Sequence, residues 1–138
     1  MSTNGGATTP GDEDLVRIAS LARQRAYAPY SNSRVGAAIR TKRGKVTAGA
    51  NVENASYGLT ICAERNAVFQ AVNAGEKGFE AIAVVADDLP RPCGACLQVL
   101  TEFCDPDLRV ILASTAGPRD VARLADLLPR PFKLEPKD

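Results

Sequence analysis

The sequence predicts an α/β fold, a three-layer α/β/α sandwich built around a mixed central sheet of about five strands. One observation is that strand-length apolar segments alternate with segments of helical period along most of the chain. Another is the unbroken apolar run at 79–86, which is typical of a strand buried on both faces. The chain has 138 residues, enough for one domain. We therefore expect a disordered tail at 1–11 and a single domain at 12–138.

The first half of the chain predicts one helix and one hairpin. Acidic residues precede an apolar stripe of helical period that starts at Leu15, and the helix must end before Pro29. Short strands at 35–41 and 46–52 flank a turn at 42–45. That turn is basic and contains a Gly, so it is either a solvated hairpin turn or a phosphate contact.

The second half alternates helices and strands. In chain order we expect a helix at 61–74, a strand at 79–86, a helix at 92–103, a strand at 109–113 and a helix at 120–128. This order favours a sheet with helices on its faces.

Charge and composition exclude several classes of protein. Lys and Arg number 17 and Asp and Glu 16, so the net charge of +1 offers no field for a nucleic acid polymer. No apolar run approaches the length of a membrane span, and the N-terminal residues lack the features of a secretory signal. Four cysteines without such a signal predict a reducing, cytoplasmic location and metal or thiol chemistry. The chain has no His, which moves any metal site onto thiolates.

Two cysteine motifs are the most informative feature of the chain, Cys62-Ala63-Glu64-Arg65 and Pro92-Cys93-Gly94-Ala95-Cys96. All three cysteines fall near predicted helix starts, where the partial positive charge of the N-terminus favours thiolates. Three thiolates can hold a zinc ion and leave its fourth tetrahedral position free for water. Glu64 can then carry protons beside that position. Residues two apart do not share a helix face, so Cys62 and Glu64 can serve one site only off the helix end.

Two other interpretations of the cysteines explain less. A structural zinc site takes four protein ligands, and the remaining candidate, Cys104, is poorly placed and is better interpreted as a small core residue. A redox Cys-x-x-Cys pair leaves Cys62 and Glu64 without a role.

The two motifs resemble those of the zinc-dependent nucleoside deaminases, whose superfamily carries His-x-Glu followed by Pro-Cys-x-x-Cys. Cys62 stands where that signature has His, so the chain resembles the small, homotetrameric, all-cysteine branch of the cytidine deaminases. The resemblance implies a deaminase domain of that fold, with Zn²⁺ on Cys62, Cys93 and Cys96 and Glu64 as the catalytic residue. It also implies that Arg65 donates hydrogen bonds to the thiolates, rather than being a plain surface arginine. The implied reaction converts cytidine and deoxycytidine to uridine and deoxyuridine plus ammonia, a step of pyrimidine salvage.

The resemblance also assigns contacts with the nucleoside substrate. Asn51 and Glu53 would hydrogen-bond the 3′-hydroxyl, since an amide and a carboxylate together offer a donor and an acceptor. Backbone groups of Ala63 and Cys93 would bind the exocyclic amine of the base.

Other residues are implied to act across a subunit boundary. In related tetramers the segment around Ala55 and Tyr57 contributes to a neighbouring site, and a Phe in the position of Phe132 stacks on the pyrimidine there. A local packing role is the alternative for Phe132.

Two positions depart from the family pattern. Ser33 stands where a Phe commonly packs against the base, and Leu97 stands where an Arg commonly follows the second cysteine motif. Because Ser33 cannot stack, a deaminase of another aminopyrimidine nucleoside, such as a nucleoside antibiotic, is an alternative. A non-catalytic zinc module is another, although Glu64 has no purpose in it. The near-neutral charge and the few aromatic residues argue against a third alternative, a deaminase that acts on polynucleotides.

Overall fold

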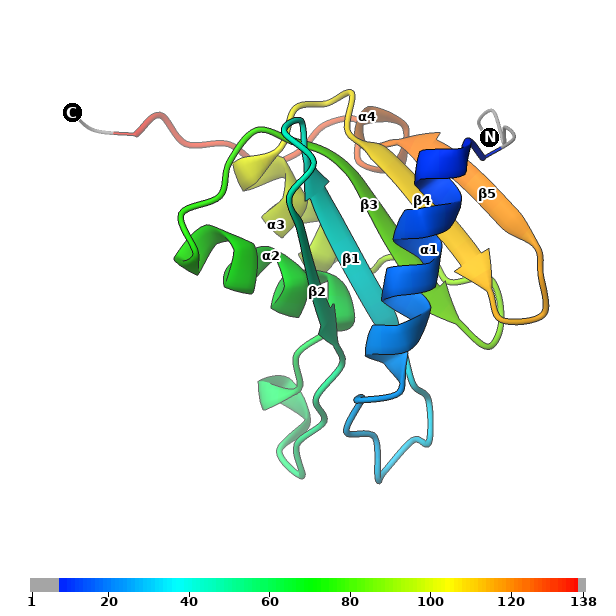
Figure 1. Cartoon of the computed structure of the whole chain (residues 1–138). Coiled ribbons are helices and arrows are strands. Elements are labelled where there is room, and N and C mark those ends of the chain that lie inside the picture. The colour runs from blue at the N-terminus through cyan, green and yellow to red at the C-terminus, as the bar shows by residue number, and fades with distance from the viewer. Residues whose placement is uncertain (1–7, 137–138) are drawn as a thin grey trace.

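The computed structural model describes residues 8–136. Within that range one mixed sheet has the strand order β2-β1-β3-β4-β5 (Figure 1). The strands are β1 (Gly36–Thr41), β2 (Val46–Ala50), β3 (Phe79–Ala86), β4 (Arg109–Ser114) and β5 (Arg119–Arg123). Strands β3 and β4 are parallel and the other neighbouring pairs are antiparallel. The predicted mixed sheet is therefore confirmed.

Helices cover both faces of this sheet, so the predicted three layers are also confirmed (Figure 1). Helix α1 (Pro10–Arg23) lies on one face, and α2 (Ala63–Asn73) and α3 (Gly94–Phe103) lie on the other. The short helix α4 (Leu124–Leu127) packs beside α3, with Leu124 in the apolar cluster of that face, and the 3₁₀ turn η1 (Tyr57–Leu59) lies outside these layers.

Strand β3 runs through the middle of the core. Ile82 and Val84 belong to the apolar cluster that α2 and α3 cover, whereas Ala81 and Val85 belong to the cluster under α1. Successive side chains of a strand point to opposite faces, so a strand buried on both faces needs apolar residues throughout. This is the physical basis of the unbroken apolar run in the sequence.

Two glycines allow the helices to approach the sheet closely. A Cβ on Gly36 would lie 2.0 Å from the carbonyl oxygen of Ala19 in α1. A Cβ on Gly49 would lie 2.7 Å from the backbone nitrogen of Ala67 in α2. Any side chain at either position would push a helix away from the core.

Helix α1 begins earlier than the sequence predicts. Thr9 is its N-cap, and the Thr9 hydroxyl and the Asp12 carboxylate form a reciprocal capping box with the backbone. Pro10 and Gly11 belong to the helix, so the predicted tail at 1–11 is wrong for these two residues, because Pro is preorganised for the first helical turn. Residues 1–7 of that tail lie outside the described residues.

Asp12 also links α1 to the sheet. Its side chain is fully buried, and the Arg109 guanidinium of β4 binds both carboxylate oxygens, at 2.6 and 2.7 Å. Burial raises the pKa of Asp12, but the hydrogen bonds from Arg109 and Thr9 outweigh it, so this pKa lies below its ordinary value.

The predicted helix at 120–128 is wrong over its first half. Residues 119–123 form β5, which pairs antiparallel with β4, and only Leu124–Leu127 are helical. Pairing with β4 buries Val121 and Ala122 and supplies the backbone hydrogen bonds that the segment needs. This partner is distant in sequence, and local helix propensity does not reveal it.

The basic turn at 42–45 is an exposed hairpin turn, with Gly44 at φ 92°. Lys42 contacts Asp105 at 3.7 Å, and these residues line none of the cavities described below. No helix within residues 8–136 is long and apolar enough to cross a membrane.

Candidate metal centre and active site

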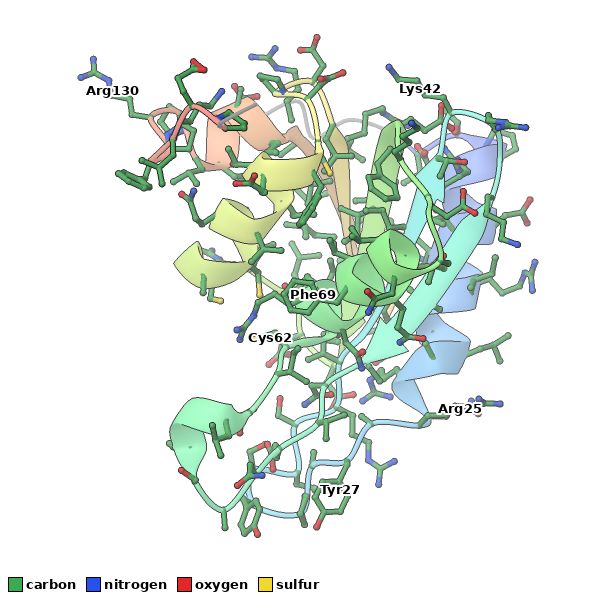
Figure 2. All side chains as sticks on the ribbon, turned by 90° about the vertical axis from the view of Figure 1, so that its left-hand side faces the viewer. Arg25, Tyr27, Lys42, Cys62, Phe69 and Arg130 are labelled. Atoms are coloured by element: carbon green, nitrogen blue, oxygen red, sulfur yellow. The ribbon has the colours of Figure 1, made fainter. Side chains whose placement is uncertain are left out.

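The three predicted ligand cysteines come together where two helices begin. Cys62 is the N-cap of α2, Cys93 is the N-cap of α3, and Cys96 lies in the first turn of α3. Their Sγ atoms all lie within 4.8 Å of one another. Figure 2 shows Cys62 between the helical part of the molecule and the loops that carry Tyr27.

The donor set fits a zinc ion. Zn–S bonds at tetrahedral angles separate two sulfur atoms by about 3.8 Å, which agrees with the spacing of the three thiols. Cys93 Sγ and Cys96 Sγ lie 3.3 Å apart, and the backbone N–H of Cys96 donates to Cys93 Sγ. Cys104 is half-buried at the end of α3 and is not part of the group, and burial raises the pKa of its thiol to about 12.

The charge balance also favours metal binding. The pKa of Cys62 is lowered to about 5, first by a hydrogen bond from Cys96 and next by the Arg65 guanidinium. The pKa of Cys96 is raised, because its thiol donates that hydrogen bond and is buried. The three thiols therefore share a proton, and a divalent cation bound to the sulfur atoms would replace that proton.

Arg65 is placed as the family resemblance implies, against sulfur rather than free on the surface. Its Nη2 donates to Cys62 Sγ at 3.4 Å. Its Nε is buried and has no hydrogen-bond partner among residues 8–136. One guanidinium thus offsets part of the negative charge that three thiolates would place here.

Glu64 lies in the first turn of α2 and is 6% exposed. Burial raises the pKa of its carboxyl group to about 7, and the neighbouring Cys62 thiolate raises it further. Cys62 precedes the helix in an extended conformation, φ −76° and ψ 155°, so both side chains line one cavity although they are two residues apart. Cys62 and Glu64 can therefore serve one site that lies beyond the N-terminal end of α2, as the sequence analysis requires of residues two apart.

The cavity has a volume of about 200 Å³. It is lined by Val35, Asn51, Thr60, Ile61, Cys62, Ala63, Glu64, Pro90, Arg91 and Cys93. A larger cavity of about 390 Å³ lies between α1, β2 and α2, but it contains no thiol or carboxylate. We place the site in the smaller cavity, because reactive groups converge there.

Asn51 and Glu53 organise a loop beside the cavity. The Asn51 side chain accepts from the Val35 N–H at 2.9 Å and donates to the Ser33 carbonyl at 2.8 Å. The Glu53 carboxylate accepts from the Ser31 hydroxyl and from the backbone N–H of Tyr30 and Ser31. The hydrogen bond from the Ser31 hydroxyl contributes most to lowering the pKa of Glu53.

The residues expected to act across a subunit boundary do not line this cavity. Ala55 is exposed, Tyr57 is 81% exposed and Phe132 is 69% exposed. The carbonyl of Phe132 accepts a 2.7 Å hydrogen bond from Gln98 of α3, which holds this part of the chain near the metal-binding helix.

The two departures from the family pattern have different structural roles. Ser33 is exposed and does not line the cavity, where Val35 and Ile61 provide apolar surface instead. Leu97 is buried in the apolar cluster that α2 and α3 share with the sheet.

Arg91 is a residue of the site that the sequence analysis did not single out. It lines the cavity two residues before Cys93. The sequence does contain a feature that could have identified it, because Arg91 is a cation between two prolines and directly precedes the Pro92–Cys96 motif.

Comparison with known proteins agrees with this geometry. The family described as "Cytidine and deoxycytidylate deaminase zinc-binding region" matches residues 10–112. A cytidine deaminase of Halalkalibacterium halodurans is 49% identical over 124 residues, 88% of this chain and 93% of that protein. The crystal structure of cytidine deaminase from Burkholderia pseudomallei is 51% identical with a TM-score of 0.85, covering 87% of this chain and 98% of that one.

A relative with another substrate is more distant. The blasticidin-S deaminase of Bacillus cereus is 32% identical over 111 residues, 73% of this chain and 78% of that protein. The three cysteines, the buried Glu64 and these similarities lead to one conclusion: the chain belongs to the cytidine and deoxycytidylate deaminase zinc-binding family.

Proposed function

We propose that this chain catalyses the zinc-dependent hydrolytic deamination of cytidine and deoxycytidine to uridine and deoxyuridine, with release of ammonia. The observation that carries the proposal is the position of Glu64. A buried carboxyl group with a pKa of about 7 lines the same cavity as the group of three thiols. Such a group can both accept and donate a proton near neutral pH.

Cys62, Cys93 and Cys96 would hold the metal, and Arg65 would keep the Cys62 sulfur oriented and partly neutralised. A bound zinc ion supplies Lewis acidity, which lowers the pKa of a water molecule and makes it a nucleophile at neutral pH.

Glu64 moves the protons of the reaction. Its carboxylate takes a proton from the attacking water and passes it to N3 of the cytosine ring, which makes C4 electrophilic. A C4–O bond forms, and the ring nitrogen takes up the electron pair of the C4–N3 double bond. Glu64 then transfers a proton from the new hydroxyl to the amino group, the C4–N bond breaks, and ammonia leaves.

The chain's other groups orient the nucleoside. Backbone groups of Ala63 and Cys93 line the cavity next to Glu64 and are proposed to bind the exocyclic amine. Asn51 lines the cavity, and Glu53 is proposed to join it at the 3′-hydroxyl of the sugar.

The proposal includes a homotetramer with shared sites, acting in the cytoplasm in pyrimidine salvage. The exposed aromatic side chains of Tyr57 and Phe132 support a role outside their own subunit, because they face away from the core of the chain that carries them. The domain proposed for this activity is 12–138, extended at its start by the helical residues Pro10 and Gly11.

The alternatives are less well supported. The relative that acts on a nucleoside antibiotic is 32% identical, against 49% for a cytidine deaminase. A non-catalytic zinc module would have no reason to bury Glu64 beside the metal centre.

Ammonia release tests the proposal, measured with cytidine, deoxycytidine, free cytosine, blasticidin S and a short single-stranded oligonucleotide. Turnover of cytidine and deoxycytidine at rates well above the others supports it. Turnover confined to the antibiotic or the oligonucleotide refutes it.

A further inference from the structure

Asn66 lies in α2 one helical turn after Cys62, and its side chain reaches across to the end of β2. Its backbone N–H donates to the Cys62 carbonyl at 3.0 Å, the hydrogen bond that closes the first turn of the helix. Its side-chain Nδ2 donates to the Ala50 carbonyl at 2.9 Å. The half-buried Asn66 therefore joins a proposed zinc ligand to the last residue of β2.

Gln70 determines the orientation of the Asn66 amide. The Nε2 of Gln70 donates to Asn66 Oδ1 at 3.1 Å and to the Ala48 carbonyl at 3.3 Å. Because Oδ1 accepts from Gln70, Nδ2 is the group that faces Ala50 and donates to it. The helix and the strand are close enough for these short bridges because Gly49 has no side chain, and a Cβ there would collide with the backbone of α2.

The Ala50 carbonyl belongs to the same peptide group as the N–H of Asn51, a residue that lines the cavity of the metal centre. That N–H donates to the Val35 carbonyl at 3.2 Å, so the peptide group is hydrogen-bonded at both ends. A peptide group is planar, and two fixed ends therefore fix the plane from which the Asn51 residue continues. The position of Asn51 relative to the metal-binding helix thus depends on Asn66.

We infer that Asn66 is a positioning residue for the sugar end of the substrate and that it acts through Asn51. Asn66 lines the larger cavity rather than the one that contains Glu64, so it acts from outside the site. The inference rests on the proposed function, in which Asn51 binds the 3′-hydroxyl while Glu64 reacts with the base. A nucleoside bound at both ends requires a fixed distance between α2 and the end of β2, because a small misplacement of either end weakens the productive complex.

Steady-state ammonia release from cytidine and 3′-deoxycytidine tests the inference. Asn66→Asp keeps the size of the side chain but replaces the donor Nδ2 by an oxygen that repels the Ala50 carbonyl. The ratio of kcat/KM for cytidine to kcat/KM for 3′-deoxycytidine should fall about 3–10-fold, through the KM of cytidine, because a hydrogen bond to the 3′-hydroxyl is weakened. Both nucleosides are uncharged, so the added negative charge affects them alike, and the uncharged variant Asn66→Ala should give a similar fall.

Asn73→Asp is the matched control, because it makes the same substitution at an exposed position at the end of α2. It should leave the ratio unchanged, and zinc content should equal that of wild type in all three variants, since every thiol is retained. A wild-type ratio in both Asn66 variants overturns the inference, and so does an equal loss for the two nucleosides, which would be a general effect on the fold. A wild-type protein that does not distinguish the two nucleosides also overturns it, because no contact with the 3′-hydroxyl is then made.

Amide hydrogen exchange tests the positioning role independently of turnover. In Asn66→Asp, the N–H groups of Val35 and Asn51, which bond to each other's residues, should exchange about tenfold faster than in wild type, because their peptide group has lost one of its two partners. The N–H of Val84 in the middle of the sheet should keep its protection. Unchanged exchange at Val35 and Asn51 would overturn the inference. Failure of the proposed function has a different result, a wild-type protein that releases no ammonia from cytidine.

Discussion

The carboxyl group of Glu64 is buried in the cavity that Cys62 also lines, and at the scale of single residues this position determines the proton chemistry. Glu64→Gln keeps the size of the side chain and removes the proton carrier. We expect kcat to fall by about 10²–10⁴-fold, because the substituted amide cannot transfer protons to the ring or the leaving amine. Zinc content should stay at the wild-type level, since the three thiols are unchanged.

The measurement combines single-turnover kinetics with elemental analysis of the same sample. Glu76→Gln serves as the matched control, since Glu76 lies beyond the end of α2 and lines neither cavity described above. A Glu64→Gln protein with near-normal turnover would limit Glu64 to a structural role.

At the scale of the elements, the ion pair between the buried Asp12 and the partly exposed Arg109 joins α1 to β4. The folded pKa of Asp12 lies below its ordinary value of 3.8, so its contribution to stability is present above that value. The contribution disappears as the pH falls from 3.8 through the folded pKa. Asp12→Asn should reduce the free energy of unfolding at pH 7 by roughly 1.5–3 kcal/mol, the typical contribution of a hydrogen bond to a charged group, because it leaves Arg109 without its charged partner.

Urea denaturation of wild type and Asp12→Asn at pH 7 and in strong acid measures this difference. It should shrink in acid, where the wild-type carboxyl is itself protonated. Asp14→Asn is the matched control on the same helix, because Asp14 is largely exposed and lies 3.8 Å from Arg17. A difference that is the same at both pH values would contradict the assigned role of the pair.

The elements also show what sequence reasoning can reach. Strand β3 and helix α2 are predictable because their apolar patterns are continuous and match one period each. Strand β5 is not predictable in this way, because its residues favour a helix locally and form a strand only by pairing with β4. The start of α1 is missed for a smaller reason, since its cap at Thr9 lies among polar residues that have no periodic pattern.

Some residues of the candidate site can likewise be predicted from the sequence, and others cannot. Cys62 and Glu64 are predictable because short motifs carry them, and the spacing of those motifs has a chemical meaning. The role of Arg91 in lining the cavity is not predictable from the sequence, because it depends on how the loop after β3 meets the start of α2. The hydrogen bonds of Asn51 to the loop at 33–35 likewise require the folded chain.

At the scale of the whole molecule, the proposed shared sites demand complementation between subunits. Glu64→Gln lacks the proton carrier, and Phe132→Ala lacks the proposed stacking residue, so each homotetramer should have low activity. Mixed tetramers should regain part of it, because some sites receive an intact group from each side. Subunits are mixed under conditions that allow exchange, and kcat is then measured per site.

Sedimentation of the same samples shows whether the chains assemble and exchange. Exchanged tetramers with no recovered activity would contradict shared sites, and so would a fully active monomer. Arg130→Gln is a suitable partner for a control mixture, because it changes an exposed charge near Phe132 and should leave both contributions intact.

The metal content of the active protein tests the central claim most directly. Elemental analysis of purified protein that releases ammonia from cytidine should give about one zinc per chain. Cys93→Ala should lose the metal together with much of the stability, since the binding free energy of a metal also contributes to folding, whereas Cys104→Ala, outside the thiol group, should retain the metal. Active wild-type protein without stoichiometric zinc would contradict the account.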